Sequence, residues 1–195
     1  RILDAAGGQL TEDTFPADEA GHVVVHGEHT VLFADGSGEI TAFDPHALEG
    51  GGMPQTENFT TPQAHHGVAV ILSDGTLVHS LGDSETRTGA VALQGDREIA
   101  RSEDCPGLHG ETVVADEVVV LGCENGALEY ANGKFTKIAS PTPYGRIGTT
   151  KGHDDSPVAL GDIQETLLIP LYGRALDAGK KNSVLHDRKA AELVD

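Results

Sequence analysis

The sequence is poor in basic and aromatic residues. Lys and Arg number 13 against 31 Asp and Glu, which gives a formal net charge of −18 with histidine neutral, and there is no Trp. Nucleic-acid-binding proteins present a basic face to the phosphates, and single-strand binders add aromatic side chains on which bases stack. The composition therefore argues against a nucleic-acid binder.

Long hydrophobic runs are also missing. The longest lie at residues 68–72 and 118–121, whereas a membrane-spanning helix needs about 20 consecutive apolar residues. We expect no membrane-spanning segment. The sequence starts at Arg1 with neither a Met nor a charged, apolar leader, which we interpret as a processed or a trimmed chain.

Glycine, in contrast, is abundant. There are 25 glycines in 195 residues, roughly double the usual share of about 7%. They separate short apolar runs and form no low-complexity tract. This is the composition of a turn-rich all-β protein.

A repeat runs along the chain, and each copy begins with a histidine. His22, His66, His109 and His153 are spaced 44, 43 and 44 residues apart, and each precedes short β-like runs separated by turns. Several of these turns are Asp-Gly or Asn-Gly pairs, which are strong hairpin signals because both central positions of the favoured turn need a positive φ. A period of about 40 to 45 residues with four strands per unit is typical of a β-propeller blade.

We therefore predict an all-β β-propeller with four-stranded blades of about 44 residues. Residues 1–171 hold about four blades, as a small closed ring or as part of a larger propeller. Residues 172–195 show no blade pattern and are expected to form a helix, a linker or a piece of a further blade. A chance spacing of the ten histidines is the rival explanation. A β-sandwich with irregular strand spacing is the structural alternative.

The periodic histidines predict a metal site. In a propeller, residues at one blade position converge on the central channel even when they are about 44 residues apart. His22, His66, His109 and His153 then face one another, and neutral imidazoles brought together suit Zn²⁺. Three histidines and a carboxylate are the expected ligand set. Further candidates for ligands or for residues that orient the rings are His65, Glu111, Asp154 and Asp155.

Two choices accompany this prediction. His65 and His66 are neighbours that should point to opposite faces of a strand, and we place His66 in the channel. A second, weaker metal site is suggested by His26, Glu28 and His29 on the first hairpin turn, for which a solvated polar turn is the alternative.

The two cysteines leave several interpretations open. Cys105 lies four residues before His109, and Cys123 ends the strand adjacent to the one that follows His109. This arrangement is compatible with a disulfide, which would favour an oxidising compartment. Two free thiols in a cytosolic protein, metal ligation by the thiols and a Cys-His nucleophile are the alternatives.

Four segments carry a resemblance to a known family. Residues 64–70 (AHHGVAV), 105–111 (CPGLHGE), 122–126 (GCENG) and 152–157 (GHDDSP) resemble those of the AztD-type zinc metallochaperones, exported β-propeller proteins encoded with a zinc ABC importer. The resemblance implies a periplasmic or cell-surface protein that binds Zn²⁺ and passes it to the solute-binding protein of the importer. It also implies a disulfide between Cys105 and Cys123, and zinc ligands among the four periodic histidines.

The chain departs from this family in two ways. It is only about half as long as we expect of a member, so several blades are absent from it. The flexible segment rich in His and Asp that some members carry is also missing, unless residues 26–29 replace it.

Three functions are consistent with the sequence. The first is a metallochaperone that carries zinc and performs no chemistry. The second is a propeller hydrolase or lactonase whose metal activates water, with Asp155 or Glu111 as the base. The third is a metal-free scaffold for protein interactions, with histidines that merely line a wet channel.

Overall fold

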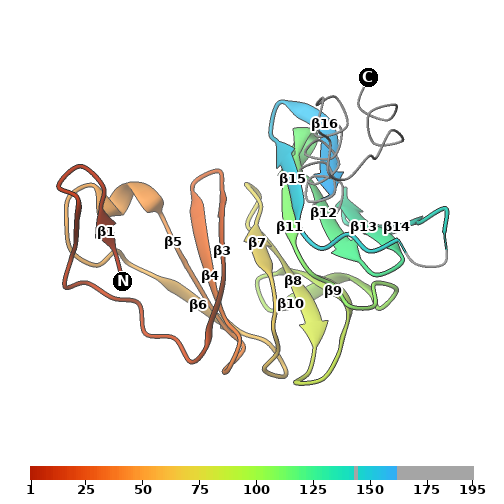
Figure 1. Ribbon diagram of the computed structural model, residues 1–195, viewed down its shortest axis with the longest axis horizontal. Helices are drawn as coiled ribbons and strands as arrows, with labels where there is room; N and C mark the ends of the chain where they lie inside the picture. Colours follow the sequence, from red (N-terminus) through yellow and green to blue (C-terminus); the bar gives the residue numbers. More distant parts are fainter. Residues whose placement is uncertain (143–144, 162–195) are drawn as a thin grey trace, which may run out of the picture.

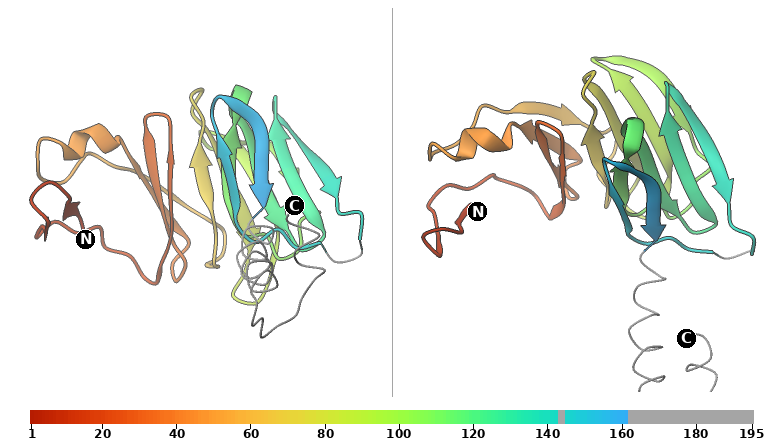
Figure 2. Two further views of the ribbon diagram at one scale, coloured as in Figure 1. Left: turned by 45° about the horizontal axis from the view of Figure 1, so that its top comes forward. Right: turned by 90° about the horizontal axis from the view of Figure 1, so that it is seen from above.

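The chain forms a succession of antiparallel β-sheets that follow the sequence order (Figures 1 and 2). The computed structural model describes residues 1–142 and 145–161. Three sheets have four strands each, and a two-stranded sheet lies before them and another after them. We call the four-stranded sheets blades 1, 2 and 3 (β3–β6, β7–β10 and β11–β14), and we call the sheet of β15 and β16 blade 4.

The strands are short, as the turn signals predict. In chain order, they are β1 (Leu3–Asp4), β2 (Gln9–Leu10), β3 (Ala20–His26), β4 (His29–Ala34), β5 (Glu39–Phe43), β6 (Glu57–Thr60), β7 (Ala69–Ile71), β8 (Thr76–Gly82), β9 (Arg87–Gln94), β10 (Arg97–Ser102), β11 (Glu111–Val114), β12 (Val118–Cys123), β13 (Gly126–Ala131), β14 (Lys134–Ala139), β15 (Thr150–His153) and β16 (Ser156–Gly161). Two short 3-10 helices, η1 (Pro45–Leu48) and η2 (Ala115–Glu117), complete the described elements.

Each blade is a meander in which every strand pairs with the next strand of the chain. The turn between β13 and β14 shows why. Asn132 and Gly133 both have positive φ, 51° and 76°, which is the conformation of the tight hairpin turn that an Asn-Gly pair favours. The predicted all-β fold with four-stranded, propeller-like blades is confirmed.

The sequence predicted four strands per blade but did not locate the outermost strands of blades 1 and 2. β6 and β10 carry mostly polar residues and are largely exposed, so neither shows the alternation of apolar and polar residues on which strand prediction relies. The remainder of the predicted fourth blade and the segment 172–195 lie outside the described residues.

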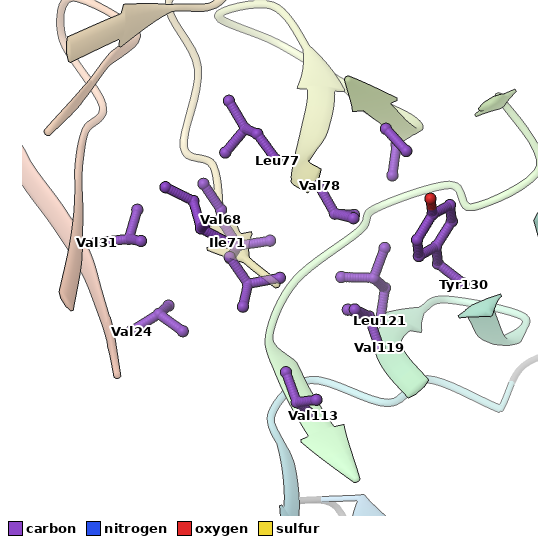
Figure 3. Packing of buried hydrophobic residues seen from close by; sticks show 14 of the residues in the cluster. Val24, Val31, Val68, Ile71, Leu77, Val78, Val113, Val119, Leu121 and Tyr130 are labelled. Atoms are coloured by element: carbon purple, nitrogen blue, oxygen red, sulfur yellow. The ribbon is translucent and has the colours of Figure 1, made fainter. Parts of the chain in front are cut away.

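Apolar packing between the blades brings the innermost strands together. Val24 and Val31 of blade 1 face Val68 and Ile71 of blade 2 (Figure 3), and all four are buried. The same buried cluster continues through β8 into blade 3. Burying a side chain of this size contributes about 1.5–3 kcal/mol. As a result β3, β7 and β11 lie near the middle of the molecule, with β15 beside β11 (Figure 1).

A disulfide fastens the segment that leads to β11. Cys105 and Cys123 are joined and fully buried. Cys105 N donates to Thr88 O of blade 2 at 3.0 Å, and Cys123 O accepts from Ile147 N at 2.9 Å. The pairing that the resemblance implies is present, and the interpretations as thiolate ligand and as nucleophile are therefore wrong.

Removing this disulfide should lower the free energy of unfolding. The cysteines are 18 residues apart, and closing a loop of that size stabilises by about 3 kcal/mol in the chain-entropy model. We expect a Cys105→Ser, Cys123→Ser double variant to lose about that amount in a urea titration, and the reduced wild-type chain to behave like it. Equal unfolding midpoints for the oxidised wild type and the variant would contradict this.

Candidate metal centre

Three of the four periodic histidines meet in the structure. His22, His66 and His109 come from blade 1, from the loop before blade 2 and from the loop before blade 3. Each offers a ring nitrogen within 4.8 Å of those of the other two. The ring centroids are 5.0–5.1 Å apart. The start of β3 and the loops before β7 and β11 thus bring the three imidazoles together.

A backbone irregularity aims His22 at this point. The register of β3 against β4 shifts between Ala20 and Val23, so Gly21 and His22 lie in a β-bulge. Bulges turn side chains out of the regular alternation and are frequent beside functional sites. Gly21 is required here because a Cβ atom at that position would overlap the carboxylate of Asp35.

His66 and His109 occupy equivalent places in their blades. Each lies five residues before the last residue of its innermost strand, β7 or β11. His109 N donates to Gly122 O at 3.0 Å. The following Gly110 has φ +78°, and a Cβ atom there would collide with the main chain at Gly148. The backbone at His109 is therefore fixed on both sides.

Hydrogen bonds fix which nitrogen faces the centre. His109 Nδ1 lies 2.6 Å from Gly148 O, and a carbonyl oxygen can only accept, so Nδ1 carries the proton and Nε2 carries the free lone pair. His66 Nδ1 donates to Asp35 Oδ2 at 2.5 Å. Both Nε2 atoms are thus available as metal ligands, in the arrangement by which carboxylates and carbonyls orient metal-binding histidines.

The third ring has a less complete partner. His22 Nδ1 lies 3.5 Å from Glu111 Oε2, which is too long for a strong hydrogen bond. That oxygen is buried and has no hydrogen-bond partner among the residues that the structure describes. An unpaired buried carboxylate is costly. A cation at the triad would offset this cost, so the site fits a positively charged ligand.

The charge state of His109 also suits metal binding. Burial lowers the pKa of His109, and the neighbouring His22 and His66 rings lower it further. A neutral imidazole is the form that binds metal. Asp35 lies beside the His66 ring and Glu111 beside the His22 ring, so the centre combines imidazole nitrogens with two nearby carboxylates.

His153 does not join the triad. It is the last residue of β15 at the hairpin turn, its side chain is 74% exposed, and it lies near Asp155. The prediction placed it at the start of the innermost strand, whereas β15 ends there. The residue equivalent to His66 and His109, five positions before the strand end, is Gly148, whose carbonyl holds His109.

Of the further residues predicted as ligands or ring-orienting groups, one lies at the triad and three do not. Glu111 lies at the triad. His65 does not, because it is buried, donates from Nδ1 to Gln63 O at 2.9 Å, and contacts Ser80 Oγ through Nε2 at 2.8 Å. The structure thus places His66, and not its neighbour, beside His22 and His109. Asp154 and Asp155 lie at the β15–β16 turn, away from the triad.

The weaker second site is not assembled as predicted. His26 donates from Nε2 to Glu117 Oε1 at 3.1 Å, and its Nδ1 lies 3.7 Å from Asp154 Oδ1, so the partners of its ring are neither Glu28 nor His29. Blade 1 thereby contacts the turns of blades 3 and 4. Among residues 1–142 and 145–161, one group of three metal-ligating side chains has its ligand atoms within 4.8 Å of one another. This group is His22, His66 and His109.

Asp35 and Gly148 were missed by the sequence analysis. Asp35 was interpreted only as the first residue of an Asp-Gly turn, and it is 31 positions from His66. Gly148 acts through its main chain, which leaves no side-chain signal. Neither contact follows from the repeat, because both depend on how one blade packs against another.

Comparisons with known proteins identify the fold. No protein-family model matches the chain, and no curated protein does. Among solved structures, AztD from Citrobacter koseri is similar, with a TM-score of 0.61 and 24% identity over 73% of this chain and 40% of that chain. The chain has the AztD fold. The apo structure of Citrobacter koseri AztD agrees, with a TM-score of 0.63, 24% identity, and coverage of 73% of this chain and 41% of AztD.

The chain therefore spans about 40% of the length of AztD. Its described blades correspond to part of that fold. The triad lies where three of these blades meet, and all three histidines belong to the present chain.

The histidines should titrate at different pH values. Burial lowers the pKa of His109, whereas the hydrogen bond with Glu49 raises the pKa of the exposed His46. At a pH near 6.5, the usual imidazole pKa, NMR of the metal-free chain should show His46 mostly protonated and His109 mostly neutral.

The same shift sets a direction for stability. Because the folded pKa of His109 lies below the unfolded value, the unfolded chain binds more protons in this range. His109 should therefore make the free energy of unfolding fall as the pH drops below about 6.5.

In the NMR experiment, a His109 resonance that titrates at or above the pH at which His46 titrates would contradict the argument from burial.

Proposed function

We propose that the chain belongs to a zinc carrier that holds Zn²⁺ at His22, His66 and His109 and passes it to another protein. The observation that carries this proposal is the convergence of three imidazoles from three blades. Two of these rings have Nδ1 occupied by a hydrogen bond, so that Nε2 is the nitrogen left free to bind a metal. An imidazole oriented in this way by a carboxylate or a carbonyl is the usual arrangement of a metal-binding histidine.

The donor set favours zinc. Three imidazole nitrogens with a fourth position open are a common Zn²⁺ environment, with Zn–N distances of about 2.0–2.1 Å. Both cysteines are in the disulfide, so no thiolate is present to select a softer ion. The negative charges of Asp35 and Glu111 would balance the two positive charges of the ion.

The surroundings favour carriage over catalysis. A zinc hydrolase needs a carboxylate base near the metal-bound water. Of the two candidate bases, Asp155 lies at the β15–β16 turn beside His153, and Glu111 faces Nδ1 of His22. Asp155 is thus away from the triad, and Glu111 stands beside a ligand ring, where its charge would stabilise the bound ion. A metal-free scaffold is less well supported, because it gives no reason for three imidazoles to converge beside a buried carboxylate oxygen that has no hydrogen-bond partner within the described ranges.

The partner and the compartment extend this proposal. By resemblance to the AztD-type proteins, the acceptor is the solute-binding protein of a zinc ABC importer, and the site of action is the periplasm or the cell surface. The disulfide supports an oxidising compartment. No helix within the described ranges is long and apolar enough to span a membrane. The acidic chain would favour an acceptor with a basic rim around its own site.

Zinc binding should depend on the triad and not on His153. We expect about one equivalent of Zn²⁺ per chain by calorimetry and by metal analysis, with binding lost in a His66→Ala, His109→Ala double variant. His153→Ala is the matched control and should bind like the wild type, because that ring is exposed and away from the triad.

Loss of zinc binding in His153→Ala would overturn the assignment. Zinc binding that survives in the His66→Ala, His109→Ala variant would overturn it as well. Transfer is tested separately, by mixing loaded protein with the metal-free acceptor. A rate that rises with acceptor concentration and exceeds spontaneous release indicates a carrier. A rate equal to the release rate at every concentration indicates a zinc buffer.

A further inference from the structure

The three rings of the triad differ in how accessible they are. The side chain of His66 is 40% exposed, whereas that of His22 is 22% exposed. His109 is partly buried beneath Gly148 O. A ligand that approaches from solvent therefore meets His66 first.

The backbones that carry the rings also differ. His22 lies within β3, and His109 is held through its main-chain N by Gly122 O at 3.0 Å. His66 lies in the loop before β7, and its main-chain N and O make no hydrogen bond to any residue in the described part of the chain. The main chain at His66 can therefore shift outward together with its ring without breaking a main-chain hydrogen bond of its own.

One carboxylate holds the His66 ring in place. Asp35 Oδ2 accepts from His66 Nδ1 at 2.5 Å, and Asp35 Oδ1 accepts from Gly67 N at 3.3 Å. Asp35 belongs to blade 1, whereas His66 precedes blade 2. The position of the most accessible ligand is thus set by a single side chain from another blade.

We propose that His66 is the ligand that leaves first when Zn²⁺ is passed on, while His22 and His109 keep hold of the ion. Asp35 is the positioning residue that sets how readily His66 leaves. This rests on the proposed function, and it adds the order of the ligand exchange to it.

The exchange itself is simple in atoms and charges. A donor atom of the acceptor binds the open fourth position of Zn²⁺, the bond from zinc to His66 Nε2 breaks, and Nε2 keeps its lone pair. No proton or electron is transferred. The ring then turns toward solvent, on the side where it is already exposed.

Two variants that leave all three ligands in place test this order. Asp35→Asn weakens the support of His66, and Glu111→Gln weakens that of His22 by the same loss of charge. Changes of this kind typically cost 10- to 100-fold in metal affinity. Weakening a zinc–ligand bond that is already broken in the transition state of release destabilises the loaded state alone, so release becomes faster. Weakening a bond that is still intact in the transition state destabilises the loaded state and the transition state equally, so the release rate does not change.

Loaded proteins are mixed in a stopped-flow instrument with a large excess of the zinc chelator pyridylazoresorcinol, and equilibrium affinities are measured separately. We expect Asp35→Asn to accelerate release by about as much as it weakens binding, roughly 10-fold or more. Glu111→Gln should weaken binding while its release rate stays within about twofold of the wild type. Circular dichroism of each metal-free variant checks the fold, and Asp35→Glu replaces Asp35→Asn if the latter does not fold.

The outcomes separate the two proposals. Faster release from Glu111→Gln than from Asp35→Asn, at a similar loss of affinity, overturns the order of exchange and leaves zinc binding intact. Equal acceleration by both variants also overturns it, because His66 is then no different from His22. A wild-type chain that binds no zinc overturns the proposed function itself.

Discussion

The hydrogen bonds that cross between blades are the interaction on which the centre depends. His66 is held by Asp35 of blade 1, and His109 is held by Gly148, which precedes blade 4. Glu111 of blade 3 stands beside His22 of blade 1. Each of these three partners comes from a blade other than that of its ring. The site therefore exists only when the blades are packed together, so metal binding and folding are coupled.

The same arrangement resolves an electrostatic problem. A partly buried pair of carboxylates is unfavourable in a chain that already carries a net charge of −18, and Glu111 Oε2 has no hydrogen-bond partner within the described ranges. A divalent cation brings two positive charges to this place. Partial burial lowers the pKa of His109, which favours the neutral ring. A neutral imidazole can bind the ion without first losing a proton.

The repeat predicted the architecture because it records the geometry of a blade directly. A period of about 44 residues fixes how often the chain returns to the channel, and so it identified His22, His66 and His109. It failed at His153 because the period alone does not state where within a strand a residue lies. β15 begins at Thr150, which places His153 at the far end of its strand.

Other features had no signal in the sequence. The outer strands β6 and β10 are polar and exposed, so their patterns resemble those of loops. Asp35 resembled an ordinary turn residue, and the contact of His26 with Glu117 joins positions 91 residues apart. These contacts arise from the packing of one blade against another, which no local pattern encodes.

X-ray absorption at the zinc edge on the loaded chain tests the central claim most directly. If the triad holds the ion, the spectrum will show about three imidazole nitrogens at about 2.0–2.1 Å in a tetrahedral site, and the imidazole signal will collapse in the His66→Ala, His109→Ala variant. A spectrum of six oxygen ligands without imidazole scattering, unchanged in that variant, would contradict the account.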